Sequence, residues 1–324
     1  MREWAKATVI AAGLFVAALG GGAPAATQSP TALTIFAAGT LAGPFRALDA
    51  AFATAYPNIV VRPEFAGSVA MAKRITELHQ RPDLLAVADF RVIPKYLFGA
   101  ADRPAYADWY AGFARNAITF TYTDASKFAA IVTPANWYAI LARPGVEIGR
   151  SNPDTDPSGY QTLQMLQLAE RYYRRPGLAQ KILANAPPKN MRDTETALLS
   201  ALQLGEIDYL AIYRSDAIQH HLKHLALPGA IDLGDPKLAK LYGTAVAQTK
   251  NGAVKGVPII YAVTIPNNAP HPDWAQKYVA LLLGAQGRKI MRESGFAPLA
   301  PAAAAGRDKM PASLRPLAAA WPSM

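Results

Sequence analysis

The apolar positions of this chain form short runs that alternate with helical patterns. A strand is predicted at 33–37, and the residues that follow it repeat at helical spacing, namely Leu41, Phe45, Leu48, Phe52 and Tyr56. Apolar runs at 59–61 and 84–87 predict two more strands, with a second amphipathic helix between them. Strand, helix and strand in this order predict an α/β fold wound on a mostly parallel sheet.

The order of the elements changes in the middle of the chain. Two long β-branched and aromatic segments, 116–122 and 258–266, enclose a second α/β set. Its predicted strands and helices are 146–149, 158–173, 208–213 and 215–222. Two helices (273–283 and 286–293) and a tail rich in Ala and Pro follow the second long segment. We therefore expect two lobes joined by two crossing strands, with lobe 1 at 26–116 and 258–324 and lobe 2 at 117–257.

The N-terminus has the features of a secretory signal. Arg2 and Lys6 precede an apolar run at 7–19, and Ala23-Pro24-Ala25 is a small-residue cleavage signal. This predicts a signal peptide over 1–25 and a periplasmic protein; an uncleaved membrane anchor is the alternative. The chain has no cysteine, which excludes a disulfide framework and a lipid-accepting Cys.

The net charge of +10 suggests an anionic partner, which could be nucleic acid, a membrane surface or a small anion. Lys and Arg are spread along the chain, and their densest groups, 73–74 and 171–175, fall within helical patterns. Together with a secretory signal, this distribution argues against nucleic acid. After the signal there is no Gly-rich phosphate loop and no nucleophile elbow, so nothing favours a nucleotide-binding protein or a hydrolase. We expect a binding protein and not an enzyme; a secreted enzyme on the same fold, with a general base beside a nucleophile, is the alternative.

Three places share one design, in which a strand ends, small or hydroxyl residues follow, and a helix begins. They are Gly39-Thr40, Gly67-Ser68 and the segment Asp156-Pro157-Ser158. A helix N-terminus presents unpaired N–H groups that suit an anion. Thr, Ser and Asp are also ordinary N-caps, so each place taken alone fits either role. Their joint occurrence in two lobes favours an anion site.

Several segments in order resemble the periplasmic tungstate/molybdate-binding proteins of ABC importers, especially the archaeal branch. They are 36–41 (FAAGTL), 66–69 (AGSV), 86–89, 106–110, 136–138, 151–154, 156–160 (DPSGY), 205–209 (GEIDY) and 219–220. The resemblance covers nearly all of the chain after the signal. It implies a type II periplasmic-binding-protein fold with a ligand cleft between two lobes. It also implies a molybdate or tungstate ligand, a membrane permease as partner, no cofactor and a monomer.

The resemblance also implies which residues bind the ligand. The hydroxyls and backbone N–H groups of Thr40 and Ser68 would contact the oxyanion. Ser158, at the third of the places described above, is a further candidate for ligand binding. Two carboxylates would bond the metal of the oxyanion, and Asp156 is the first choice for one of them, with Asp154 second. A plain N-cap is the alternative role for Asp156.

At the second carboxylate the sequence departs from the family pattern. Ile212 stands where a Glu is expected, and Tyr213 follows it. Here the chain resembles the classical molybdate-binding proteins, in which a Tyr donates its hydroxyl to a tetrahedral oxyanion; an aromatic packed between the lobes is the alternative. Our hypothesis is a tetrahedral anion with weaker discrimination against sulfate. The alternative ligands are sulfate, phosphate or a small organic acid.

Overall fold

The computed structural model describes residues 31–322 except 102–103 and 194, and these residues belong to one compact unit. The predicted signal peptide at 1–25 lies outside the described residues. The unit contains a seven-stranded sheet, a five-stranded sheet and a two-stranded hairpin. Within the described part of the chain, no helix is both long and apolar enough to cross a bilayer.

The seven-stranded sheet has the order β14-β13-β4-β12-β3-β1-β2. Its strands are β1 (Thr31–Ala38), β2 (Ile59–Ala66), β3 (Leu84–Val87), β4 (Tyr110–Arg115), β12 (Ile260–Thr264), β13 (Ala297–Ala305) and β14 (Ala318–Ala320). β1 is parallel to β2 and β3, whereas β12 is antiparallel to β3 and β4. The first three strands are parallel, as the sequence predicted, but the sheet as a whole is mixed and not mostly parallel.

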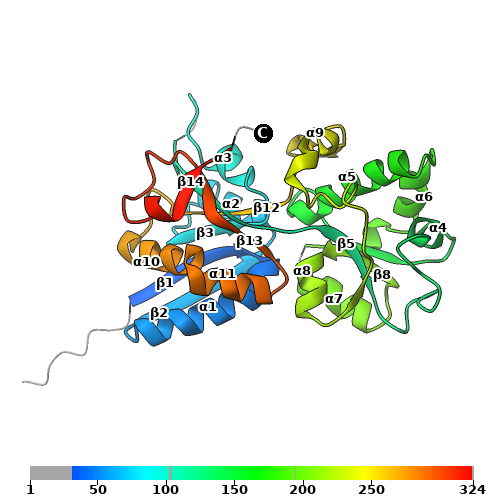
Figure 1. Ribbon diagram of the computed structural model, residues 1–324, viewed down its shortest axis with the longest axis horizontal. Helices are drawn as coiled ribbons and strands as arrows, with labels where there is room; N and C mark the ends of the chain where they lie inside the picture. Colours follow the sequence, from blue (N-terminus) through cyan, green and yellow to red (C-terminus); the bar gives the residue numbers. More distant parts are fainter. Residues whose placement is uncertain (1–30, 102–103, 194, 323–324) are drawn as a thin grey trace, which may run out of the picture. The chain divides into compact units, whose positions relative to one another are not determined.

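Both faces of this sheet are covered by helices. Ile35 of β1 packs in a cluster with residues of α1 (Ala42–Ala55), α10 (Pro272–Leu283) and α11 (Ala285–Glu293), which cover one face in Figure 1. Phe36, the next residue, packs with residues of α2 (Ser68–Thr76) and α3 (Val92–Tyr96). Successive side chains of a strand point to opposite faces, so continuous apolar runs are what a doubly covered sheet requires.

The five-stranded sheet has the order β7-β6-β8-β5-β9. Its strands are β5 (Ile118–Tyr122), β6 (Ile148–Ser151), β7 (Met191–Arg192), β8 (Tyr209–Tyr213) and β9 (Lys223–His224). The helices of this part are α4 (Trp137–Leu141), α5 (Pro157–Tyr172), α6 (Leu178–Ala184), α7 (Glu195–Gln203), α8 (Arg214–Gln219) and α9 (Ala239–Tyr242). The hairpin pairs β10 (Val246–Thr249) with β11 (Gly252–Lys255). Short 3-10 turns lie at Gly39–Leu41 (η1), Pro188–Asn190, Pro236–Leu238 and Arg315–Leu317.

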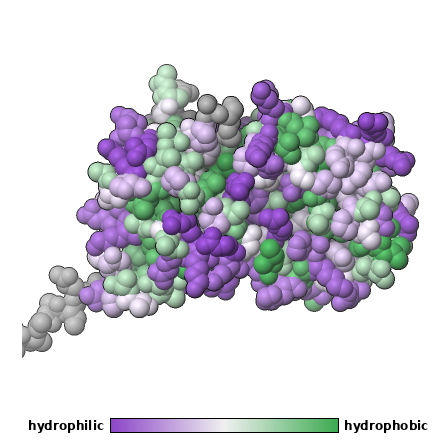
Figure 2. Space-filling view, in the orientation of Figure 1, coloured by the Kyte–Doolittle hydropathy of each residue, from purple (hydrophilic) through white to green (hydrophobic). Residues whose placement is uncertain are grey.

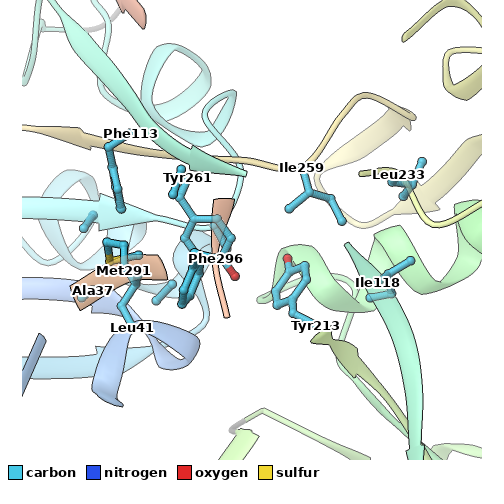
Figure 3. Packing of buried hydrophobic residues seen from close by; sticks show 14 of the residues in the cluster. Ala37, Leu41, Phe113, Ile118, Tyr213, Leu233, Ile259, Tyr261, Met291 and Phe296 are labelled. Carbon is cyan, nitrogen blue, oxygen red and sulfur yellow. The ribbon is translucent and has the colours of Figure 1, made fainter. Parts of the chain in front are cut away.

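The chain passes from one sheet to the other after β4 and returns before β12. Asn116 donates its backbone N–H to the carbonyl of Ile259 at 3.2 Å, and Ile259 donates to the carbonyl of Leu233 at 2.8 Å. The first bond pairs the two crossing segments, and the second joins the returning segment to the loop that contains Leu233. Figure 3 shows Ile118, Ile259 and Tyr261 packed around this crossing, within one buried cluster that contains residues of both sheets.

Several features differ from the sequence-based prediction, among them the hairpin of β10 and β11, which was not predicted. The long segments 116–122 and 258–266 are not continuous strands, because β5 begins only at Ile118 and β12 covers only Ile260–Thr264. β4 was not predicted. The Ala- and Pro-rich tail contributes β13, which pairs with β4 and shifts register between Pro298 and Ala303. A Pro is tolerated in a strand where the ladder is interrupted in this way.

The surface has a mixed distribution of hydropathy. On the face in Figure 2, hydrophilic and hydrophobic residues are interspersed, as on most soluble proteins.

Candidate functional site

A cavity of about 630 Å³ is lined by residues that belong to both sheets' helices and loops. Gly39, Arg46 and Gly67 come from the elements of the seven-stranded sheet, and Asp156 and Asp216 come from those of the five-stranded sheet. Thr40, Ser68 and Ser158 are buried, and each lies one or two positions along the sequence from a lining residue. All three strand ends singled out in the sequence therefore meet at one place.

Gly67 allows the two sets of loops to meet. A Cβ atom on Gly67 would collide with the carbonyl oxygen of Thr155, the residue before Asp156. Ala70 donates its backbone N–H to the same carbonyl at 3.3 Å. This close backbone approach requires a residue without a side chain, and it brings Ser68 beside Asp156.

A second contact joins α1 to α8. A Cβ atom on Gly43 would collide with the side-chain oxygen of Gln219, and the amide of Gln219 donates to the carbonyl of Thr40 at 3.3 Å. The loop after β1 is therefore held against the helix that carries Asp216.

The hydroxyls of Thr40 and Ser68 are held by groups of their own sheet. The Thr40 Oγ1 lies 2.8 Å from the Tyr261 hydroxyl. The Ser68 Oγ accepts a 2.9 Å hydrogen bond from the backbone N–H of Ala88. Because Ser68 acts as the acceptor there, that bond does not use its own hydroxyl hydrogen.

Asp156 is the N-cap of α5. Its Oδ1 accepts a 2.8 Å hydrogen bond from the Ser158 backbone N–H, and Pro157 occupies the first helical position. Asp156 also lines the cavity, and burial raises the pKa of its carboxyl. The cap uses one carboxylate oxygen, so capping and ligand binding are compatible. The Ser158 Oγ is buried and has no hydrogen-bond partner among the described residues.

Asp154 faces a different partner. Its Oδ1 accepts the backbone N–H of Lys250 at 2.7 Å, and its carbonyl accepts the side-chain amide of Asn251 at 2.8 Å. Both partners lie in the turn of the β10–β11 hairpin. Asp154 is therefore occupied in holding this turn.

Tyr213 is fully buried and its hydroxyl donates to the Gln161 Oε1 at 2.7 Å. Its ring packs edge-on against Tyr261, with 5.8 Å between ring centroids. The residue thus packs at the crossing and also makes a specific hydrogen bond. Gln161 was not singled out in the sequence; its Nε2 is buried and has no hydrogen-bond partner among the described residues.

Asp216 was also missed. It is buried, it lines the cavity, and its Oδ2 has no hydrogen-bond partner within the described residues. Burial and the neighbouring charge of Asp156 raise the pKa of its carboxyl well above the usual value. One signal was available in the sequence, because Ser215 and Asp216 follow a strand and open a helix, as Thr40 and Ser68 do.

Ile212 is not among the lining residues of the cavity, although it packs in one buried cluster with Leu199, which does line it. Strand alternation places it with Leu210 in a cluster formed with Leu198 and Leu202 of α7, whereas Tyr213 belongs to the main core. The position that the resemblance marked for a carboxylate is therefore a core position in this protein.

Arg46, His220, His221 and Glu293 also line the cavity. Burial, and then the charges of Arg46 and His221, lower the pKa of His220, which favours its neutral form. Arg46 supplies a permanent positive charge, which attracts anions toward the cavity.

Three buried polar atoms, Ser158 Oγ, Gln161 Nε2 and Asp216 Oδ2, therefore lie on the first turns of α5 and α8 without protein partners among the described residues. An unpaired buried polar group costs about 1–3 kcal/mol. Native proteins satisfy nearly all such groups, so these three atoms are candidates for contact with a polar ligand. Arg115 Nε, Gln164 Oε1 and Asn268 Oδ1 are also buried and unpaired among the described residues, and of the three candidates only Asp216 belongs to the cavity lining.

The chain belongs to the family of bacterial extracellular solute-binding proteins, whose model matches residues 33–297. An uncharacterised solute-binding protein of Petrotoga mobilis is 38% identical over 289 residues, covering 87% of this chain and 88% of that protein. The molybdate/tungstate-binding protein WtpA of Thermococcus kodakarensis is 35% identical over 296 residues, covering 83% of this chain and 82% of that protein. The predicted resemblance is confirmed, and the family is one of solute-binding proteins and not of enzymes.

Among solved structures, the periplasmic molybdate-binding protein of Azotobacter vinelandii aligns with a TM-score of 0.59 and 17% identity. The alignment covers 82% of this chain and 98% of that one. At this identity the likeness concerns the fold alone, and it confirms the predicted α/β binding-protein fold.

Proposed function

We propose that this protein binds molybdate or tungstate in the cavity lined by Asp156 and Asp216 and delivers it to the permease of an ABC importer. In this proposal it acts as a monomer in the periplasm, and the oxyanion is its cargo and not a cofactor. The observation that carries the proposal is the pair of buried carboxylates beside unpaired hydroxyl and amide groups. The name of the relative from Thermococcus kodakarensis supports the same ligand class.

The chemistry of the two kinds of group is complementary. Hydroxyls of Thr40, Ser68 and Ser158 would donate to the oxyanion oxygens without cancelling its charge. Carboxylates repel a free dianion unless they bond its central atom. Molybdenum and tungsten can expand their coordination and sulfur cannot, so two carboxylate ligands select for the metal oxyanions. The raised pKa values of Asp156 and Asp216 favour retention of a proton, which keeps two adjacent buried negative charges from forming.

Asp216 changes the hypothesis drawn from Ile212. A second carboxylate is available from α8, so we infer that discrimination against sulfate is strong and not weak. Hydrogen phosphate is the second candidate ligand, because its P–OH could donate to either carboxylate.

Calorimetric titration of the purified, oxyanion-depleted protein with molybdate, tungstate, sulfate and phosphate tests the proposal. We expect tight binding of molybdate and tungstate and no heat with sulfate. X-ray absorption of the tungstate complex should then show six oxygen neighbours around the metal. Binding of phosphate alone would assign the second candidate, and four neighbours would exclude carboxylate ligation.

A further inference from the structure

We propose that Gln161 donates its side-chain amide to an oxygen of the ligand, and that Tyr213 positions Gln161 for this contact. The inference rests on the proposed function, because it assigns to the bound ligand a residue of α5 that is not itself among the lining residues of the cavity. It also changes the expected role of Tyr213, from a direct donor to a positioning residue.

The hydrogen bonding of the Gln161 amide carries the first step. The side chain is 1% exposed, its Oε1 accepts the Tyr213 hydroxyl at 2.7 Å, and its Nε2 has no partner among the described residues. Oε1 and Nε2 share one carbon, so fixing the oxygen also fixes the direction of the two N–H bonds. The amide is thus an oriented donor with its hydrogens uncommitted.

The position of Gln161 on α5 carries the second step. Ser158 and Gln161 are three residues apart in the first turns of the helix, so they share a face. The Ser158 Oγ is likewise buried and unpaired among the described residues. Asp156, which caps this helix, lines the cavity. Two independent unpaired groups and the cap thus mark one end of α5 as the ligand-facing end.

The surroundings of Tyr213 indicate that its hydroxyl positions Gln161. Its ring lies against that of Tyr261 at an angle of 67°, and the Tyr261 hydroxyl lies 2.8 Å from Thr40 Oγ1 (Figure 3). The two tyrosines come from β8 and β12, one from each sheet. The Tyr261 hydroxyl contacts Thr40 and also accepts a 3.4 Å hydrogen bond from the side-chain amide of Asn116, whereas the Tyr213 hydroxyl donates to Gln161. Because the Tyr213 hydrogen is donated to Gln161, the contact with the ligand falls to the amide.

The donor character of the Gln161 amide affects which ligand oxygen it can contact. An amide NH₂ can only donate, so it suits a ligand oxygen without a proton, as in molybdate and tungstate near neutral pH. A protonated oxygen is a weaker acceptor than an oxyanion oxygen, so the amide favours a ligand orientation that presents an unprotonated oxygen to it.

The test compares molybdate titrations of wild type, Gln161→Leu, Gln161→Glu, Tyr213→Phe and the double variant Gln161→Leu/Tyr213→Phe. We expect Gln161→Leu to weaken affinity about 10- to 100-fold, as for loss of a hydrogen bond to a charged group, and Gln161→Glu to weaken it further. Tyr213→Phe should weaken affinity less. The double variant should match Gln161→Leu alone, because Tyr213 acts through Gln161.

Gln167→Leu is the matched control. Gln167 lies on the same helix, and both of its amide atoms are bonded to the backbone of Val246 in β10. This variant should keep wild-type affinity, and thermal melts should show that all variants fold.

Wild-type affinity in Gln161→Leu, or additive losses in the double variant, would overturn the inference while leaving the proposed function standing. If wild type itself binds no metal oxyanion, both the proposed function and this inference fail.

Discussion

The hydroxyl of Tyr160 on α5 donates a 2.8 Å hydrogen bond to the Asp89 carboxylate, which follows β3 in the other sheet. Burial opposes ionisation of Asp89, but Arg91 and Tyr160 together hold the pKa of its carboxyl below the usual value. Arg91 in turn donates to the carbonyl of Lys255 in β11. Asp89, Arg91 and Tyr160 thus form a buried bridge from one sheet to the helix that carries Asp156.

Loss of this bridge should shorten the lifetime of the complex. Tyr160→Phe removes the donor to Asp89, and we expect the dissociation rate of molybdate to rise about tenfold, since most affinity changes appear in this rate. Stopped-flow displacement of molybdate by excess tungstate measures it. Tyr172→Phe, at an exposed position of the same helix, is the control and should behave as wild type. An unchanged rate in Tyr160→Phe would show that the bridge does not hold the bound state.

The two carboxylates of the cavity should be required for binding. Asp216→Asn and Asp156→Asn each replace a carboxylate oxygen that would bond the metal in the proposed function, and we expect each to weaken tungstate binding by about 100-fold or more, which is about 2.7 kcal/mol. Titration calorimetry gives the affinities. Asp216→Asn should melt no lower than wild type, because a buried carboxyl is replaced by a neutral group of similar shape.

Asp154→Asn is the control for both substitutions. Asp154 bonds the backbone of Lys250, so its replacement should leave affinity within about threefold, or 0.7 kcal/mol. A large loss in Asp154→Asn with wild-type binding in Asp156→Asn would reverse the assignment of the two residues.

A side chain at position 67 should separate the loops that meet at the site. Gly67→Ala places a methyl group against the Thr155 carbonyl, so we expect affinity to fall at least tenfold. Melting temperature and molybdate affinity should be measured on the same sample. Gly229→Ala is the control, because a Cβ there meets no atom within 4 Å. Equal affinities in the two variants would mean that the loops can move apart at no cost.

A carboxylate at position 212 should destabilise the protein and not improve the site. Ile212 is 1% exposed within the cluster of α7, so Ile212→Glu buries an ionisable group among apolar residues. We expect a loss of about 4 kcal/mol or more in the free energy of unfolding, against about 1 kcal/mol for Ile212→Val. Denaturant unfolding measures both. A stable Ile212→Glu protein with tighter tungstate binding would restore position 212 to the site.

Ionisation of Asp49 should lower the free energy of unfolding as the pH rises from about 4 to 6. Burial raises the pKa of Asp49 to about 6, and the hydrogen bond from Tyr278 only partly offsets this. In that window the native state binds more protons than the unfolded state, so each rise in pH favours unfolding. Asp232, whose pKa burial also raises to about 6, contributes in the same direction.

Asp49→Asn should remove the contribution of Asp49 to this pH dependence of the free energy of unfolding. Relative to wild type, the variant should be equally stable near pH 4 and more stable by about 1–2 kcal/mol above pH 7, with allowance for partial solvent exposure. Thermal melts across this range measure the difference. A stability difference independent of pH would show that Asp49 does not titrate as inferred.

Local features of the sequence determined a large part of this protein. Helical and strand periodicity predicted β1, α1, β3 and α5 to within a few residues, because burial of one face imposes a period that can be read directly. The hydroxyl residues after strands predicted three places that the structure brings to one cavity. The resemblance to the solute-binding family came from short ordered motifs, and it is confirmed.

Only the tertiary structure decided which polar groups face the cavity. Asp154 and Asp156 are two residues apart, yet one holds a hairpin turn and the other lines the site. Asp216 and Gln161 became candidates because packing left their polar atoms buried and unpaired among the described residues. Such relationships depend on contacts between segments far apart in sequence. Local spacing does not predict which distant group will form a hydrogen bond with a buried donor or acceptor.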